Sequence, residues 1–325
     1  MSDRLSSLTH RDAPWAGLRV LVTGLGVSGF AAADALLERG AHVLVVDGAQ
    51  PSGVLAERAR ILDILGAALA FGPDAVARMP GTPLDLVVTS PGWRPDQSLL
   101  AEAAATGIPV WGEVELAWRM RPEHGAAPWL TVTGTNGKTT TVQMLTSILR
   151  AAGLRACSAG NVGTPILEAV VHPEPFDVIA VELSSFQLHW SHSIAPQASA
   201  CLNVAPDHVD WHGSLEEYGD AKARIFELQG GGDTHVGNLD DAAKAYEGGD
   251  GEDPDLAARA LLLGWSASVR WLRGDLEGCR AKYRALAPTL AARYQNWDAF
   301  ADDLARLFRT TDDKVRRESL VTASG

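Results

Sequence analysis

Short hydrophobic runs alternate with helical patterns along the first third of the chain. Residues 18–23, 41–47 and 84–89 are rich in Val and Leu and have the length of buried strands. Residues 29–39 place apolar positions at helical spacing and end at Gly40, as a helix often does. Strands that alternate with helices pair in parallel and carry the helices on both faces of the sheet. The pattern therefore predicts a doubly wound α/β domain over residues 15–121.

The same alternation starts again after residues 121–128, a polar stretch with two prolines that we interpret as a linker. A glycine-rich turn separates the first strand of this second block from a long helix. The block predicts a second α/β domain over residues 129–229. Its expected strands are residues 129–133, 178–182 and 198–203, and its long helix is residues 139–152.

The pattern changes at three consecutive glycines, residues 230–232. The following stretch, to residue 255, is rich in Gly and Asp and is typical of a solvated connector. Beyond it no strand pattern is convincing, so we expect a small all-helical tail over residues 253–325. Its helical patterns cover residues 256–263, 276–286 and 297–308.

Composition narrows the class of protein. The chain has 325 residues and a net charge of −12, which argues against a nucleic-acid binder that relies on a broad basic surface. No run of 18 apolar residues occurs, and the first 14 residues lack the apolar stretch of a signal peptide. We therefore expect a cytoplasmic protein that does not enter a membrane. The three cysteines are far apart in sequence and indicate neither a zinc site nor a disulfide framework.

A glycine-rich loop, Gly-Leu-Gly-Val-Ser-Gly at residues 24–29, follows the first predicted strand. Glycines in such a loop let the backbone approach the phosphates of a ligand at the start of a helix. Asp47 ends the next predicted strand, 18 residues after Gly29, where its carboxylate can accept a hydrogen bond from a ligand hydroxyl. The context predicts a Rossmann-like nucleotide site that uses Gly26, Ser28, Gly29 and Asp47. The loop alone does not specify the nucleotide, so an NAD-dependent enzyme stays open here.

A second loop, Thr-Gly-Thr-Asn-Gly-Lys-Thr-Thr at residues 133–140, gives a sharper signal. Backbone N–H groups of such a loop wrap phosphate oxygens, its lysine neutralises the β- and γ-phosphates, and the next hydroxyl helps to hold Mg²⁺. The first glycine stands three residues before the second, instead of the usual five, which marks a distinct subtype of phosphate loop. The loop predicts ATP binding by Gly134, Thr135, Asn136, Gly137, Lys138, Thr139 and Thr140.

Gly-Thr-Asn-Gly-Lys-Thr is the phosphate-loop pattern of the Mur ligases and of the related folylpolyglutamate synthases. Other motifs narrow the resemblance to the Mur ligases that add D-glutamate (MurD), over about residues 16–227. Three long motifs carry it: Val-Glu-Leu-Ser-Ser-Phe-Gln-Leu at 181–188, Asn-Val-Ala-Pro-Asp-His-Val-Asp-Trp-His-Gly at 203–213, and Tyr-Gly-Asp-Ala-Lys-Ala-Arg-Ile-Phe at 218–226. Shorter motifs stand in the same order: Ser-Pro-Gly at 90–92, Gly-Glu-Val-Glu-Leu at 112–116 and Gly-Asn-Val-Gly at 160–163.

The resemblance implies a reaction with ATP and Mg²⁺ as cofactors. ATP phosphorylates the carboxylate of UDP-N-acetylmuramoyl-L-alanine, and the amine of D-glutamate attacks the acyl phosphate. Phosphorylation is needed because a carboxylate repels nucleophiles and has no oxygen that can leave. The site must then neutralise several negative charges held close together.

The resemblance also implies roles for single residues. Lys138, Glu182, His208 and Lys222 would be catalytic. Mg²⁺ would be held by Thr139, Glu182, His208 and Lys222, the lysine acting as a carbamate formed with CO₂. That reaction needs the neutral amine and hence a lowered pKa. The UDP-linked substrate would contact the first glycine loop, Ser90, Pro91, Gly92, Asn161 and Ser184.

The end of the chain departs from the MurD pattern. These ligases carry a third α/β domain with a Pro-His-Arg segment and an Asn-Asp-Ser-Lys-Ala-Thr-Asn segment, and neither occurs in this sequence. We expect the resemblance to stop at Glu227. Two functions therefore stay open: a working ligase, and a catalytically deficient protein that binds nucleotide and UDP-sugar as a remnant or regulator.

Overall fold

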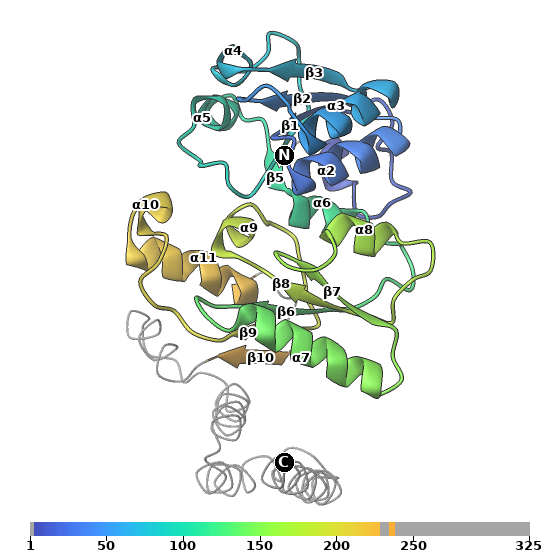
Figure 1. Cartoon of the computed structure of the whole chain (residues 1–325), viewed down its shortest axis with the longest axis vertical. Helices are drawn as coiled ribbons and strands as arrows, with labels where there is room; N and C mark the ends of the chain where they lie inside the picture. The colour runs from blue at the N-terminus through green and yellow to red at the C-terminus, as the bar shows by residue number, and fades with distance from the viewer. Residues whose placement is uncertain (1–2, 228–233, 238–325) are drawn as a thin grey trace, which may run out of the picture. The chain divides into compact units, whose positions relative to one another are not determined.

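The computed structural model describes residues 3–227 and 234–237. It contains two sheets, and strands β1 to β9 lie within one compact unit that ends at His235 (Figure 1). The first sheet has the strand order β3-β2-β1-β4-β5 and the second β10-β9-β6-β8-β7. The strands of the first sheet are β1 (Arg19–Thr23), β2 (His42–Asp47), β3 (Ala68–Phe71), β4 (Leu86–Thr89) and β5 (Val110–Gly112). The strands of the second sheet are β6 (Trp129–Thr133), β7 (Ala156–Gly160), β8 (Val178–Glu182), β9 (Ala198–Cys201) and β10 (Thr234–Gly237).

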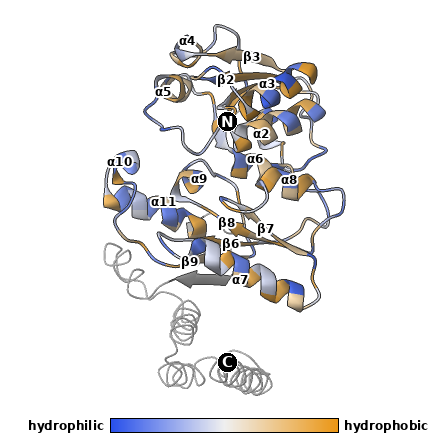
Figure 2. Ribbon diagram, in the orientation of Figure 1, coloured by the Kyte–Doolittle hydropathy of each residue, from blue (hydrophilic) through white to orange (hydrophobic). Residues whose placement is uncertain are grey.

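Helices connect the strands, as parallel pairing requires. In the first half these are α1 (Asp3–Ser6), α2 (Val27–Glu38), α3 (Val54–Ile64), α4 (Pro73–Val76), α5 (Ser98–Ala105) and α6 (Glu113–Arg119). In the second half they are α7 (Lys138–Ala151), α8 (Ile166–Val171), α9 (Ser185–His189), α10 (Val209–His212) and α11 (Leu215–Glu227). Figure 2 shows hydrophilic and hydrophobic residues following each other along α7, which packs on β6, β7 and β8. An amphipathic helix of this kind buries one face against its sheet.

The first sheet places two loops side by side. Strand β1 is central, with Thr23 paired to Val46 of β2 on one side and to Thr89 of β4 on the other. Because β2 and β4 lie on opposite sides of β1, the chain reverses direction across the sheet at this point. Ligands of open α/β sheets bind beyond the carboxyl ends of the strands at such a switch point. The loops that follow β1 and β4 both begin at this edge of the sheet.

The second sheet has the same arrangement around its central strand β6, which pairs in parallel with β8 and β9. The carboxyl end of β6 leads into the phosphate loop, and β8 ends at Glu182. The topology therefore brings residues far apart in sequence to one edge of the sheet.

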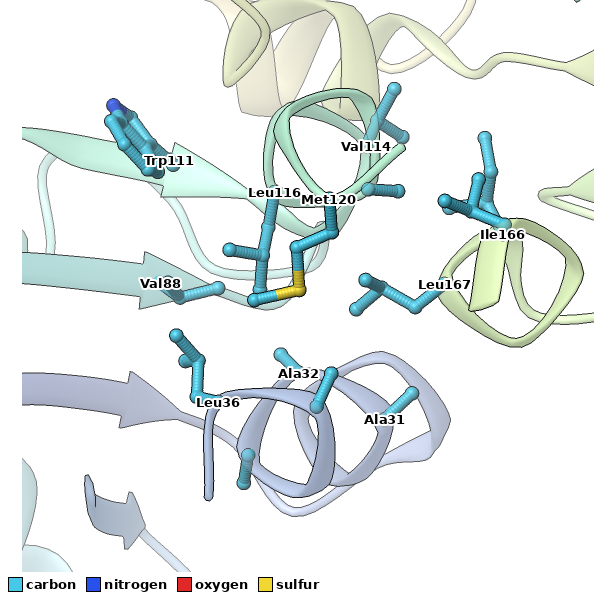
Figure 3. Packing of buried hydrophobic residues seen from close by; sticks show 14 of the residues in the cluster. Ala31, Ala32, Leu36, Val88, Trp111, Val114, Leu116, Met120, Ile166 and Leu167 are labelled. Atoms are coloured by element: carbon cyan, nitrogen blue, oxygen red, sulfur yellow. The ribbon is translucent and has the colours of Figure 1, made fainter. Parts of the chain in front are cut away.

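One hydrophobic cluster continues from the first sheet to the second. Figure 3 shows its junction, where Leu116 and Met120 lie between Ala32 of α2 and Leu167 of α8. Helices α2, α6 and α8 contact one another in pairs. Burying these apolar side chains stabilises the contact between the two sheets at about 25 cal/mol per Å² of apolar surface.

The parallel-sheet α/β class predicted from the sequence is confirmed. Two predicted strands, Trp129–Thr133 and Val178–Glu182, have the expected bounds. The expected helical tail over residues 253–325 lies outside the described residues. Within the described ranges, no helix has the length and apolar character needed to cross a bilayer.

Candidate active site

The loop between β6 and α7 turns at two glycines. Gly137 is the N-cap of α7 and has φ of 84°, a left-handed conformation that side chains other than glycine rarely adopt. Gly134 also has a positive φ, 149°, and an added Cβ there would lie 3.0 Å from the Cβ of Leu202. The glycines thus let the loop curl back over the start of α7, where free N–H groups and the helix dipole favour a phosphate.

Two lysines donate to the same carbonyl oxygen of this loop. Lys138 Nζ lies 2.8 Å from Gly134 O and 3.0 Å from Thr135 O. Lys222 Nζ, from α11, lies 3.0 Å from Gly134 O. The structure therefore brings two of the four predicted catalytic residues to one atom at the start of the phosphate loop.

Lys222 is almost completely buried, with 2% of its surface exposed. Burial, and to a lesser degree the nearby positive charge of Lys138, lowers the pKa of Lys222 to about 8. Its ammonium also lies 4.5 Å from the ring centroid of Tyr218. A substantial fraction of Lys222 is consequently the neutral amine near pH 8.

Glu182 at the end of β8 faces the phosphate loop. Its Oε2 accepts a hydrogen bond of 2.8 Å from the Thr139 hydroxyl, and its Oε1 accepts one of 3.0 Å from the Asn161 amide. The carboxyl group is 1% exposed and has these neutral donors in place of a cation. A buried carboxylate next to a hydroxyl offers the oxygen ligands that Mg²⁺ prefers.

The remaining predicted metal ligand, His208, lies on a different segment. It is the N-cap of α10, with φ of 50°, and its ring nitrogen Nε2 lies 3.5 Å from Asp207 Oδ2. Its ring packs on Phe186, 4.8 Å away between centroids. In the part of the chain that the structure describes, no group of three or more His, Cys, Asp and Glu side chains could hold a metal ion. The pair that suits Mg²⁺ is therefore Thr139 and Glu182, and these residues fit such an ion.

The loop that follows β9 supports the phosphate loop. The side chain of Asn203 accepts a hydrogen bond from Asn136 N at 2.9 Å and donates one to Asn136 O at 3.1 Å. Thr135 Oγ1 lies 3.0 Å from the Tyr218 hydroxyl. Sequence reasoning gave no role to Asn203 or Tyr218, although both stand in the motifs that carry the family resemblance. Position at the carboxyl end of a strand was the available signal for Asn203.

In the first sheet, the predicted nucleotide loop is held by Asp47. Its carboxylate accepts hydrogen bonds from Leu25 N at 2.9 Å and Ala49 N at 3.0 Å. At Gly29 an added Cβ would overlap the carbonyl oxygen of Gly24, so the start of α2 can approach the loop only with glycine at this position. Gly26 has open space around its Cα.

The other predicted substrate residues fall into two groups. Ser90 donates to Thr23 O at 2.8 Å, and Pro91 and Gly92 follow it in the loop after β4, the strand that pairs with β1. Ser184 is the N-cap of α9, where its hydroxyl accepts from Gln187 N at 3.2 Å and completes a capping box. Ser28, also predicted to contact the substrate, is half-buried, and Thr140, predicted to bind ATP, is exposed.

Residues 132–250 match the family model described as the Mur ligase middle domain. The chain is 51% identical over 255 residues to a UDP-N-acetylmuramoylalanine--D-glutamate ligase of Thermobifida fusca, covering 78% of this chain and 52% of the relative. It is 56% identical over 234 residues to the ligase of that name from Frankia casuarinae, covering 71% and 47%. A solved ligase from Neisseria meningitides superposes with a TM-score of 0.46 at 18% identity, over 72% of this chain and 76% of that one.

The chain spans about half the length of the curated relatives it matches. The family match runs to residue 250, so the expectation that the resemblance stops at Glu227 is wrong. The sequence from 228 to 250 is rich in Gly and Asp, and this composition hid the likeness from an inspection of motifs.

Proposed function

Because this chain belongs to the Mur ligase family, we propose that it acts in the ATP-dependent joining of D-glutamate to UDP-N-acetylmuramoyl-L-alanine. The observation that carries the proposal is the convergence of Lys138, Lys222 and the Thr139–Glu182 pair around one phosphate loop. The names of relatives about half identical to this chain support the choice of substrates. These substrates and ATP are small and water-soluble, which is consistent with a cytoplasmic reaction.

In the proposed reaction the second loop binds the phosphates of ATP. Backbone N–H groups at the start of α7 hold the phosphate oxygens, and the Lys138 ammonium turns from the loop carbonyls to the β- and γ-phosphates. Concentrated positive charge lowers the barrier because negative charge accumulates on the oxygens around the transferred phosphoryl group. The substrate carboxylate attacks the γ-phosphorus, ADP leaves, and an acyl phosphate forms. The amine of D-glutamate then displaces inorganic phosphate to give the amide.

Thr139 and Glu182 would hold Mg²⁺, with His208 approaching from α10. When bound, the ion supplies charge neutralisation and orientation of the ATP phosphates. Asn161 fixes the Glu182 carboxylate from its other side, through the 3.0 Å hydrogen bond to Oε1. Ligand groups held in this way need little reorganisation during the reaction.

The burial of Lys222 supports its proposed modification. A neutral amine attacks CO₂ and loses a proton to become a carbamate, which replaces a cation with an anionic oxygen ligand. The lowered pKa, about 8, makes the neutral amine accessible near physiological pH. An unburied lysine would keep its proton and resist this reaction.

The test uses the purified full chain with UDP-N-acetylmuramoyl-L-alanine, Mg·ATP and D-glutamate. Calorimetry measures the binding of each ligand, and mass spectrometry measures the amide product, with L-glutamate as the matched control. We expect saturable binding of both nucleotide ligands, and product that depends on D-glutamate. Binding of NAD tighter than that of the UDP-linked substrate would reject the proposal. Binding of both ligands without product would assign the chain a nucleotide-binding role alone.

A further inference from the structure

Residues 189–193, which we call the junction segment, run from the last residue of α9 into the following loop. Three separate elements bind this segment: α6, β5 and α11. The segment follows Glu182 and Ser184 closely in sequence, because α9 between them has only five residues. Any shift of the junction segment would therefore move the Glu182 and Ser184 side of the proposed site.

The strongest contact comes from Glu115 of α6, which is completely buried. Its Oε2 accepts hydrogen bonds from His192 N at 2.7 Å and Ser193 N at 2.8 Å. Its Oε1 accepts one from Ser193 Oγ at 2.6 Å and one from Arg119 Nε at 2.6 Å. Burial alone would raise the pKa of Glu115, but these donors outweigh it and hold the pKa below its usual value. The charged carboxylate is thus fully satisfied.

Arg119 extends the network to the start of the chain. Its Nη1 donates to the carbonyl oxygens of Leu5 at 3.3 Å and Leu8 at 3.2 Å. Its guanidinium carbon lies 4.4 Å from the ring centroid of Trp111, which stands beside α6 in Figure 3. This arginine therefore links Glu115 to the start of the chain, and it donates to the same Oε1 that accepts from Ser193 Oγ.

Strand β5 and helix α11 bind the same segment. Gly112 N donates to Trp190 O at 2.9 Å, and His192 Nε2 lies 2.9 Å from Val110 O. From α11, Arg224 Nη2 donates to Ser191 O at 2.6 Å. Lys222 stands two residues earlier on that helix, so the junction segment also holds the helix that carries the buried lysine.

We infer that Glu115 is a positioning residue that sets the spacing between the first glycine loop and the Ser184–Lys222 side of the second sheet. The inference rests on the proposed function, in which one substrate spans both sites: its UDP end lies at the first loop and its carboxylate at the second. Positioning of this kind matters because misplacing the reacting groups by about 1 Å can cost on the order of 100-fold in rate. The ligand that spans both sites should depend on Glu115, whereas ligands confined to one sheet should not.

The experiment compares three ligands by calorimetry: UDP-N-acetylmuramoyl-L-alanine, UDP alone and Mg·ATP. In Glu115→Gln we expect binding of the first to weaken at least tenfold, while UDP and Mg·ATP stay within threefold of the unmodified chain. Ser193→Ala removes only the hydroxyl that donates to Oε1, so it should weaken the spanning ligand by a smaller factor in the same direction. Glu102→Gln is the matched control, because Glu102 accepts a backbone N–H from Met79 at 2.8 Å but is exposed on α5.

The ratio of affinities separates positioning from general stability. If Glu115→Gln fails to fold, Ser193→Ala decides alone. Equal weakening of all three ligands, or an unchanged ratio in a folded variant, overturns the inference and leaves the proposed function standing. Failure of the unmodified chain to bind either UDP ligand rejects the proposed function and the inference together.

Discussion

Lys138 and Lys222 hold their ammonium groups against one carbonyl oxygen, although like charges repel. The two hydrogen bonds to Gly134 O offset part of that repulsion. A ligand with several negative charges would offset much more, because each phosphate oxygen can accept from a lysine directly. We therefore expect the pair to favour the binding of a polyanion at this loop.

Replacing Lys138 with alanine should weaken Mg·ATP binding at least tenfold, about 1.4 kcal/mol. The Lys138 ammonium is the cation that the loop itself contributes, whereas Lys222 comes from α11 and is almost completely buried. Calorimetry on the folded variant measures the change. Arg60→Ala, which removes an exposed cation from α3, is the control and should leave the affinity unchanged. Equal affinities for Lys138→Ala and the unmodified chain would contradict the ATP assignment.

The buried Lys222 should make the free energy of unfolding depend on pH in the alkaline range. Its pKa in the folded chain, about 8, lies below the 10.5 of an ordinary lysine. Between these values the unfolded chain binds more protons, so the free energy of unfolding rises with pH. Lys222→Met removes this effect, and its stability relative to the unmodified chain should fall by roughly 2 kcal/mol from pH 7 to pH 9.5. Urea denaturation at the two pH values measures this, and a constant difference would show that Lys222 is not desolvated.

At the scale of elements, the turn from β1 into α2 depends on one close backbone approach. Gly29→Ala should lower the free energy of unfolding by roughly 1–3 kcal/mol, because its Cβ would overlap the Gly24 carbonyl. Gly26→Ala lies three residues away in open space and should change stability by less than about 0.5 kcal/mol. Thermal unfolding of the two variants compares them directly. Equal melting temperatures would mean that the loop relaxes without cost.

Strands were predictable from sequence where most residues of the segment are β-branched. Val178–Glu182 and Trp129–Thr133 are of this kind. Strand β7, Ala156–Gly160, consists of small residues and has no strand signal of its own; its pairing with β8 along five residues creates it. Strand β5, Val-Trp-Gly, has only three residues, which is too short to give a strand pattern, and its pairing with β4 defines it. Tertiary pairing decided these elements, and local propensity did not.

In the candidate site, too, some features could be predicted from the sequence and others could not. Residues whose side chains carry chemistry, such as Lys138 and Glu182, stand in motifs that the sequence displays. Contacts through the backbone do not: the Gly134 carbonyl that accepts from two lysines, and the Asn136 backbone that pairs with Asn203, could be found only in the fold. Two of these contacts join residues far apart along the chain: Lys222 lies 88 positions from Gly134, and Asn203 lies 67 positions from Asn136, so no local pattern records them.

At the scale of the whole described unit, each sheet offers a loop at its carboxyl edge, and α6 lies between them. The buried carboxylates of Glu113 and Glu115 both stand on this short helix. Glu113 faces the Ser28 hydroxyl and the backbone N–H groups of Leu167 and Ile166, although burial raises its pKa overall. The helix thus reaches the first glycine loop and the second sheet at once. Because the two proposed nucleotide sites lie on different sheets, we expect each to respond mainly to changes in its own loop.

The independence can be tested with Asp47. Its carboxylate accepts from Leu25 N and so shapes the first glycine loop, on the sheet that does not carry Lys138. Asp47→Ala should weaken UDP-N-acetylmuramoyl-L-alanine binding at least fivefold, about 1 kcal/mol, while Mg·ATP binding stays within twofold. The exposed Asp63→Ala on α3 removes the same charge and controls for the change in net charge. If Asp47→Ala weakened the binding of both ligands by the same factor, the two sites would form one cooperative structure. The prediction that each loop binds its own nucleotide independently would then be wrong.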